Sequence, residues 1–402
     1  MGEHAHFGSA GLLRVVTAAS MVTLTVGLSA APAGAAARLA AAAPVTGTRA
    51  GLAGVTAIPG TTGAWAVGEN CPRAPEGCTP GRDLVLRESN SRWSQVPAPS
   101  PGGQASLVAV SADSASDAWA VGSWDGGEKN LYLHWDTNSW KQVPGPDNST
   151  LASVAAISPK DALAVGYTTS RSGSTVTLAL RWDGRTWTRT RTPNPGGAGD
   201  DELLGVTALS ATDAWAVGSS LDPQATTKTL ILHWNGSHWS QASVPAVPTD
   251  GTQLSGVAAA SPSDVWAVGR YNSAGDFEHP LILRWNGHGW AREKLPSAGQ
   301  KTEMLYGVAA TASSVWAVGL GPCIGPSINC PSKTLTMHLT SSGWRVAPSV
   351  SVSDRVDQNA LAGVAITAAS TAWAVGDYFP AAESEPIYAL LQRWNGSAWK
   401  KG

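Results

Sequence analysis

The blocks LLGVTA (Leu203–Ala208), WAVG (Trp215–Gly218) and LILHWNGSHW (Leu230–Trp239) form the unit that decides the fold. The same three blocks return in the same order about every 50 residues, which is the spacing of a repeat architecture. WAVG begins at Trp65, Trp119, Trp215, Trp266, Trp316 and Trp373, and a variant, LAVG, begins at Leu163. The chain therefore contains seven copies of one unit.

Apolar residues alternate with a period of two in each block. In WAVG the Trp and the Val share one face, and in LILHW both Leu residues and the Trp share one face. Asn-Gly pairs such as Asn235-Gly236 favour tight hairpins, so each unit predicts a four-stranded antiparallel meander. One such sheet has two apolar faces and is unstable alone, whereas sheets standing around an axis bury each other's faces.

We therefore predict an all-β protein, a seven-bladed β-propeller of four-stranded antiparallel blades over residues 51–402. The units run from the first strand near Leu52 to the fourth strand near Trp399, so both ends fall at a blade boundary. No strand is left over to latch the first blade to the last. We expect the ring to close by face packing, with the two ends close together.

The N-terminal 50 residues have a different character from the repeats. Arg14 precedes an apolar stretch, Val15–Ala31, and small residues follow, with Ala31-Pro32-Ala33 as one cleavage signal. This pattern predicts a signal peptide over residues 1–37 and a flexible lead-in over 38–50, and hence a secreted, extracellular or cell-wall-associated protein. An uncleaved membrane anchor is the alternative, although the apolar stretch is shorter than the ~20 residues a spanning helix needs.

The four cysteines all lie in the part predicted to be exported. They form two local pairs by spacing, Cys71 with Cys78 and Cys323 with Cys330. Export makes two local disulfides the simplest arrangement. A zinc site is the weaker alternative, because neither pair has nearby histidines or the tight spacing of structural zinc sites.

The composition argues against two classes of partner. The net charge is -2, only 14% of residues are charged, and the repeats contain no Lys/Arg run. Nucleic acid and, after signal removal, membrane surfaces are therefore poor candidates. No nucleophile elbow, H-E-x-x-H zinc motif or calcium loop occurs, so we predict neither a metal nor a cofactor.

A basic residue precedes the Trp position of the third strand in every unit. The set is Arg87, His134, Arg181, His233, Arg284, His338 and Arg393. A cationic ring would be one interpretation. Because a feature shared by all blades serves the fold, we expect a structural contact instead, with turn carboxylates such as Asp117, Asp161, Asp213 and Asp264.

The stretch HWDTNSW (His134–Trp140) resembles the end of a kelch repeat, as found in galactose-oxidase-like propellers. The N/D-G-x-x-W turns also resemble degenerate Asp boxes of sialidase-like propellers. WAVG carries one Gly where kelch repeats have two, and the Ser/Thr that opens an Asp box is missing. The resemblance implies a propeller fold and says little about activity.

Loop length varies on only one face of such a disc. The loops between strands 2 and 3, and the connections from strand 4 to the next strand 1, differ in every unit, and we call their side the variable face. The opposite, repetitive face carries the tight 1–2 and 3–4 turns. Non-repeating residues beside the variable loops are the candidate ligand-binding residues: Glu69, Trp124, Tyr167, Arg270, Tyr271, Glu303, Asp357, Asp377 and Tyr378.

Two functions remain open. The first is an exported, non-catalytic, monomeric propeller that binds an extracellular polysaccharide or protein on its variable face. The second is a carbohydrate-active hydrolase or lyase with an acid pair at the axial pocket, for which Asp201, Glu202, Glu303 and Asp357 are the acids to inspect. Regular blades and missing catalytic motifs favour the first.

Overall fold

A computed structural model describes residues 49–70, 81–197, 199–222, 224, 226–247, 251–272, 277–296, 301–324, 332–352, 356–380 and 387–402. These residues form seven sheets of four strands and one short 3-10 turn, η1 (Asp125–Gly127). The predicted signal peptide lies outside the described residues. Ala50, which the sequence analysis placed in the lead-in, is the first residue of β1, and Arg49 before it forms an isolated bridge with Tyr388.

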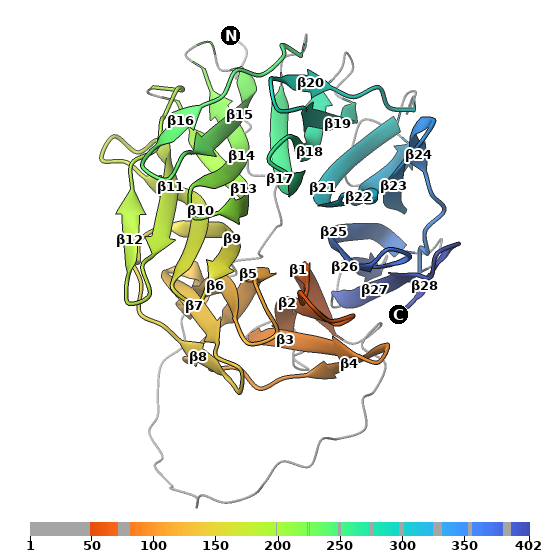
Figure 1. Cartoon of the computed structure of the whole chain (residues 1–402), viewed down its shortest axis with the longest axis horizontal. Helices are drawn as coiled ribbons and strands as arrows, with labels where there is room; N and C mark the ends of the chain where they lie inside the picture. Colours follow the sequence, from red (N-terminus) through yellow and green to blue (C-terminus); the bar gives the residue numbers. More distant parts are fainter. Residues whose placement is uncertain are drawn as a thin grey trace, which may run out of the picture. The chain divides into compact units, whose positions relative to one another are not determined.

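The strands follow one another in the same order in every blade (Figure 1). The first strands are β1 (Ala50–Ala57), β5 (Ala105–Ala112), β9 (Thr150–Ser158), β13 (Asp201–Ser210), β17 (Thr252–Ser261), β21 (Lys301–Thr311) and β25 (Val356–Ala368). The second strands are β2 (Ala64–Asn70), β6 (Ala118–Trp124), β10 (Asp161–Thr169), β14 (Asp213–Leu221), β18 (Asp264–Asn272), β22 (Ser314–Ile324) and β26 (Thr371–Pro380).

The outer half of each blade completes the meander. The third strands are β3 (Arg82–Ser89), β7 (Lys129–Trp135), β11 (Thr175–Trp182), β15 (Thr227–Trp234), β19 (Glu278–Trp285), β23 (Thr334–Thr340) and β27 (Tyr388–Trp394). The short fourth strands are β4 (Arg92–Gln95), β8 (Trp140–Gln142), β12 (Trp187–Thr190), β16 (Trp239–Gln241), β20 (Trp290–Arg292), β24 (Gly343–Val346) and β28 (Trp399–Lys401). All pairings within the blades are antiparallel, as predicted.

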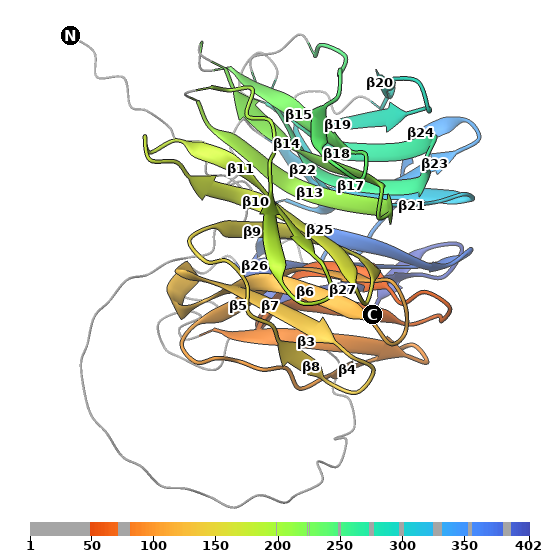
Figure 2. The same cartoon turned by 60° about the vertical axis from the view of Figure 1, so that its left-hand side comes forward.

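The sheets stand around a common axis with their first strands innermost (Figures 1 and 2). Each first strand contacts the next, and β25 contacts β1, which closes the ring. Among the strands that the structure describes, no sheet contains a strand from another unit, in agreement with the predicted closure without a latch strand. The two ends of the described chain both reach β27: Arg49 forms a bridge with Tyr388, and the N–H of Gly402 donates to the carbonyl of Leu391.

The hydrophobic core lies between the blades. It divides into seven clusters, and each cluster draws its buried side chains from two neighbouring blades. Between blades 1 and 2, for example, the Trp65 ring packs on those of Trp135 and Trp140 at centroid distances of 4.9 and 5.2 Å. Burying large aromatic rings in this way dominates the energetics of such interfaces.

The glycine of WAVG has a steric cause. A Cβ on this glycine would lie 1.8–2.0 Å from a carbonyl oxygen of the first strand in all seven blades; in blade 4, Gly218 would meet the carbonyl of Glu202 at 2.0 Å. The first strand shifts register at the same place, between Leu203 and Gly205. Only glycine allows the two strands to approach so closely at this bulge.

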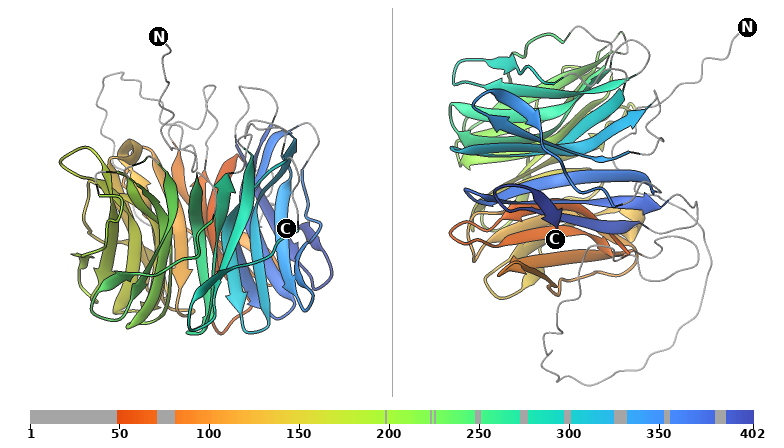
Figure 3. Two further views of the ribbon diagram at one scale, coloured as in Figure 1. Left: turned by 90° about the horizontal axis from the view of Figure 1, so that it is seen from above. Right: turned by 90° about the vertical axis from the view of Figure 1, so that its right-hand side faces the viewer.

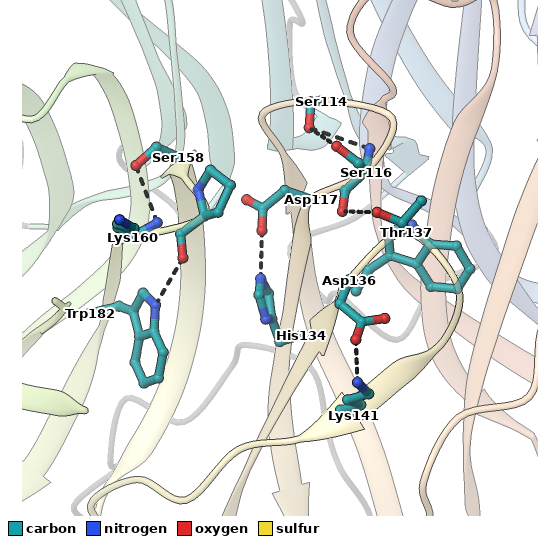
Figure 4. A network of polar contacts seen from close by, with 12 residues as sticks. Ser114, Ser116, Asp117, His134, Asp136, Thr137, Lys141, Ser158, Lys160 and Trp182 are labelled. Carbon is teal, nitrogen blue, oxygen red and sulfur yellow. Dashed lines mark hydrogen bonds and ion pairs between the residues drawn. The ribbon is translucent and has the colours of Figure 1, made fainter. Parts of the chain in front are cut away.

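The predicted contact of the basic residues is confirmed in four blades. Arg181 Nη2 lies 2.7 Å from Asp161 Oδ2, Arg284 Nε lies 2.8 Å from Asp264 Oδ1, and His233 Nε2 lies 2.8 Å from Asp213 Oδ1. His134 pairs with Asp117 in the same way (Figure 4). In blade 6, His338 Nε2 instead lies 3.2 Å from Ser314 Oγ.

The same basic residues lie over tryptophan rings. His134, His233 and His338 lie against the second-strand Trp of their own blade at 4.2–4.3 Å, and Arg87, Arg284 and Arg393 lie over theirs at 4.7–5.9 Å. Arg181 lies over Trp234 of the next blade, because its own blade has Leu163 at the Trp position. Seven such contacts make the basic residues part of the fold.

Candidate functional site

A narrow cavity of about 240 Å³ runs along the axis and is lined by all seven first strands. Its described lining residues are mostly Gly, Ala, Val and Ser, and none of them carries a carboxylate. One position departs from this pattern. The residue after the first-strand Leu is small or aliphatic in six blades, whereas blade 6 places Tyr306 there.

The residue that follows WAVG changes from blade to blade. It is Glu69, Ser123, Tyr167, Ser219, Arg270, Leu320 and Asp377 in blades 1 to 7. Second strands run toward the variable face, so this residue stands near the variable end of each blade, directly outside the first strand (Figure 3). A block that is WAVG in six of the seven blades is therefore followed at once by a position that holds six different residue types.

Arg270 connects blades 5 and 6 at this level. Its Nη1 lies 2.6 Å from Glu278 Oε1 in its own blade and donates to Met304 Sδ at 3.4 Å in the next. The Tyr306 hydroxyl is directed at the same sulfur, at 3.8 Å. Burial raises the pKa of Tyr306 to about 12. The charge of Arg270 lowers this pKa, and the charges of Glu278 and Asp377 raise it. The charged groups thus gather around the one tyrosine of the axial cavity.

Glu69 and Asp377 form an acidic pair of neighbouring blades. Burial, and then the charge of Glu69, raise the pKa of Asp377 to about 7. Burial also raises the pKa of Glu69, whose Oε2 is buried without a hydrogen-bond partner. Asp377 Oδ2 lies 3.4 Å from where a Cβ on Gly51 would be, so the glycine leaves room for the carboxylate.

The acids considered for catalysis do not converge. Asp201 is fully buried and accepts the N–H of Gly196 at 3.0 and 3.2 Å, which makes it a turn residue. Glu202 Oε1 accepts Ser219 Oγ at 3.1 Å and Gln253 Nε2 at 3.0 Å. Glu303 lies half-buried at a register shift of β21. Asp357 lies on β25, and its side chain is outside the described residues.

The aromatic candidates lie apart, at the variable ends of separate blades. Lys129 Nζ lies 4.4 Å from the Trp124 ring, and Arg292 lies 4.4 Å from the Tyr271 ring. Tyr378 stacks on Tyr388 with centroids 5.3 Å apart. Tyr167 is half-buried between Thr150 and Thr177. Each of these ring contacts lies within one blade.

The predicted disulfides stay predictions. Cys71, Cys78 and Cys330 lie outside the described residues, and of Cys323 only the backbone is described, on β22. No group of three or more His, Cys, Asp or Glu side chains in the described part of the chain is arranged to hold a metal ion. The described residues also include no helix with the length and apolar character required to cross a bilayer.

The sequence analysis missed Tyr306, Met304, Gln253 and Glu278. Tyr306 had a readable signal, because it is the one aromatic at a repeat position that otherwise holds small or aliphatic residues. Met304 and Glu278 had none, since only the register of two blades brings them to Arg270.

Comparison with solved structures defines the class as a β-propeller. The chain is similar to a YCF48 structure bound to a D1 peptide, with 13% identity, a TM-score of 0.50 and coverage of 86% of this chain and 92% of that one. It is similar to a catalytically inactive virginiamycin B lyase from Staphylococcus aureus with quinupristin, with 14% identity, a TM-score of 0.52 and coverage of 86% and 96%.

A third similar structure is a polysaccharide lyase, an ulvan lyase bound to -[GlcA(1-4)Rha3S]-, with 9% identity, a TM-score of 0.52 and coverage of 88% and 96%. No protein-family model and no curated protein matches the sequence. At these identities the comparisons establish the fold, and the propellers they reach perform different functions.

Proposed function

We propose that this protein is an exported, non-catalytic propeller that binds an extracellular polysaccharide or protein on its variable face. The observation that carries the proposal is the change of the residue after WAVG from blade to blade, directly beside a block that is WAVG in six of the seven blades. Residues that differ from blade to blade are not needed for the packing that all blades share, so their side chains are available to bind a ligand.

The charged residues Arg270, Glu69 and Asp377, which we call the charged centre, give the variable face its recognition chemistry. Arg270 of blade 5 offers donors to a carboxylate or hydroxyl group, and Glu69 of blade 1 and Asp377 of blade 7 offer acceptors. The rings of Trp124, Tyr271 and Tyr378 lie at the variable ends of their blades, where flat faces suit a sugar ring or a peptide side chain. Convergent polar groups with aromatic neighbours are typical of binding sites.

The alternative, a hydrolase or lyase, has less support. It requires two carboxylates that face one substrate bond. Asp201 accepts the N–H of Gly196, Glu202 Oε1 accepts hydrogen bonds from Ser219 and Gln253, and the described lining of the axial cavity holds no acid. Resemblance to a lyase at 9% identity carries fold only.

A binding screen with the purified propeller tests the proposal. We expect the wild-type chain to bind a member of a set of cell-wall polysaccharides, glycans and peptides, and Arg270→Ala to weaken that binding at least tenfold, as for the loss of a central interface arginine. Arg189→Ala removes an exposed arginine of β12 and serves as the matched control, with unchanged binding. Equal loss in both variants, or products released from a polysaccharide, would contradict the proposal.

Export, the monomeric state and the kelch-like character of the repeats belong to the same proposal. Export rests on Arg14 and the apolar stretch that follows it, and the kelch-like character rests on His134–Trp140. Expression with residues 1–50 in a secreting host, followed by N-terminal sequencing of the product, tests the predicted cleavage near residue 37.

A further inference from the structure

A tryptophan closes the repetitive face of most blades. The third strand ends in Trp135, Trp182, Trp234, Trp285 and Trp394 in five of the seven blades. In four of these the indole Nε1 donates to a carbonyl of the 1–2 turn of the same blade, at 3.0–3.4 Å. Figure 4 shows one such bond, from Trp182. The ring therefore fills the interval between the third strand and the 1–2 turn.

The same ring also packs against the preceding blade. Trp135, Trp182, Trp285 and Trp394 contact the second-strand Trp of that blade at centroid distances of 4.8–5.1 Å. The indoles of Trp135, Trp182 and Trp285 thus have two partners, a turn carbonyl for the N–H and a neighbouring ring for the face.

Blade 1 has Glu88 at this position, and a pocket takes the place of the ring. The cavity measures about 310 Å³ and lies between the 1–2 turn, Ile58–Gly63, and the end of β3, Arg87–Asn90. It is therefore in the interval that the indole fills in blades 2 to 5. Its volume is at the lower end of the range for small-ligand sites.

The carboxylate of Glu88, a residue that lines the pocket, can accept a further hydrogen bond. Glu88 is only 3% exposed; its Oε1 accepts the N–H of Ser91 at 2.6 Å, while Oε2 is buried without a partner. Across the seam, Arg393 Nε is also buried without a partner, since Thr371 stands where blades 3 to 5 have an Asp. A buried, unsatisfied carboxylate oxygen is costly and favours a ligand that brings a donor.

We propose that this pocket binds an indole group, with its N–H donated to Glu88. Trp373, the equivalent of the ring on which an indole packs at four other seams, is present at this one and contacts Trp93 at 5.2 Å. The indole comes either from a free small molecule or from a tryptophan side chain of a partner protein. The site is on the repetitive face and is independent of the function proposed above.

Saturation-transfer NMR with the purified propeller tests this assignment, with indole and N-acetyl-tryptophanamide as probes. We expect saturable binding of indole and at least tenfold weaker binding of 1-methylindole, which lacks the donor. Binding of N-acetyl-tryptophanamide equal to that of indole assigns the site to a protein side chain, and binding of indole alone assigns it to a free small molecule. No saturable binding of either probe overturns the proposal.

Two variants locate the binding. Glu88→Trp combined with Thr371→Asp restores the pattern of the other blades and should abolish indole binding, because the chain's own ring fills the pocket. Leu339→Trp makes the corresponding change in blade 6 and should leave binding unchanged. Glu88→Gln alone replaces one carboxylate oxygen by an NH2 donor, while the remaining oxygen can still accept the Ser91 N–H. It should weaken indole binding at least tenfold, and it keeps the test decisive if the double variant does not fold. Indole binding that survives both Glu88 variants overturns the assignment.

Discussion

Replacing Gly218 by alanine is expected to lower the free energy of unfolding by about 3 kcal/mol or more. The added Cβ would meet the carbonyl oxygen of Glu202 at 2.0 Å, and that oxygen belongs to the backbone of β13, where Asp201, Glu202 and Leu203 all pair with β14. A flexible side chain would move aside, but a paired backbone resists. The midpoint of urea unfolding, followed by circular dichroism, measures the effect.

Gly289→Ala is the matched control. Gly289 lies in a 3–4 turn, and a Cβ there would have no heavy atom within 4 Å among the described residues. We expect a change within about 0.5 kcal/mol, as for ordinary surface substitutions. A Gly218→Ala variant as stable as this control would show that the bulge next to WAVG is not rigid.

Replacing Asp377 by asparagine should stabilise the protein above neutral pH. The pKa of this carboxyl is 3.8 in an unfolded chain and about 7 in the fold, so between these values the folded state binds more protons than the unfolded one. The stability of the wild-type protein therefore falls as pH rises from about 4 to 7. The interval corresponds to on the order of 4 kcal/mol at most.

The asparagine variant should be close to wild type at pH 4 and clearly more stable at pH 8, as measured by urea unfolding at both values. Asp183→Asn is the control, because backbone N–H groups of Thr186 and Arg185 lower the pKa of this exposed turn residue. Its stability should not rise at pH 8. Parallel pH profiles of wild type and Asp377→Asn would mean that burial does not hold the Asp377 proton.

The fold was predictable because the sequence repeats the residues of one set of contacts seven times. Period-two alternation gave the strands, Asn-Gly pairs such as Asn235-Gly236 gave the hairpins, and the blade count followed from the copies of WAVG. The pairing of Arg181 with Asp161, and of three other basic residues with their turn acids, was predicted for the same reason. Because residues needed for packing recur in every blade, the repeat separates them from residues that serve other roles.

The site was predictable only in part. Glu69, Arg270 and Asp377 were found because they break the repeat. The effect of Arg270 and Asp377 on Tyr306, and of Glu69 on Asp377, depends on which strands face each other across the seams. Glu88 illustrates the limit more sharply. Glu88 stands at the end of the third strand, where five other blades have a Trp. The pocket beside Glu88 shows where the indole of those blades would lie.

Closure without a shared strand also determines how the ring responds to force. Because both ends of the described chain reach β27, tension applied at the termini loads the side chains between blades 7 and 1 before it loads any covalent connection. The ring would then open between blades 7 and 1, and the blades would unfold one after another. Each unfolding event would lengthen the chain by one repeat. A propeller latched by an exchanged strand would first have to shear a whole β-ladder.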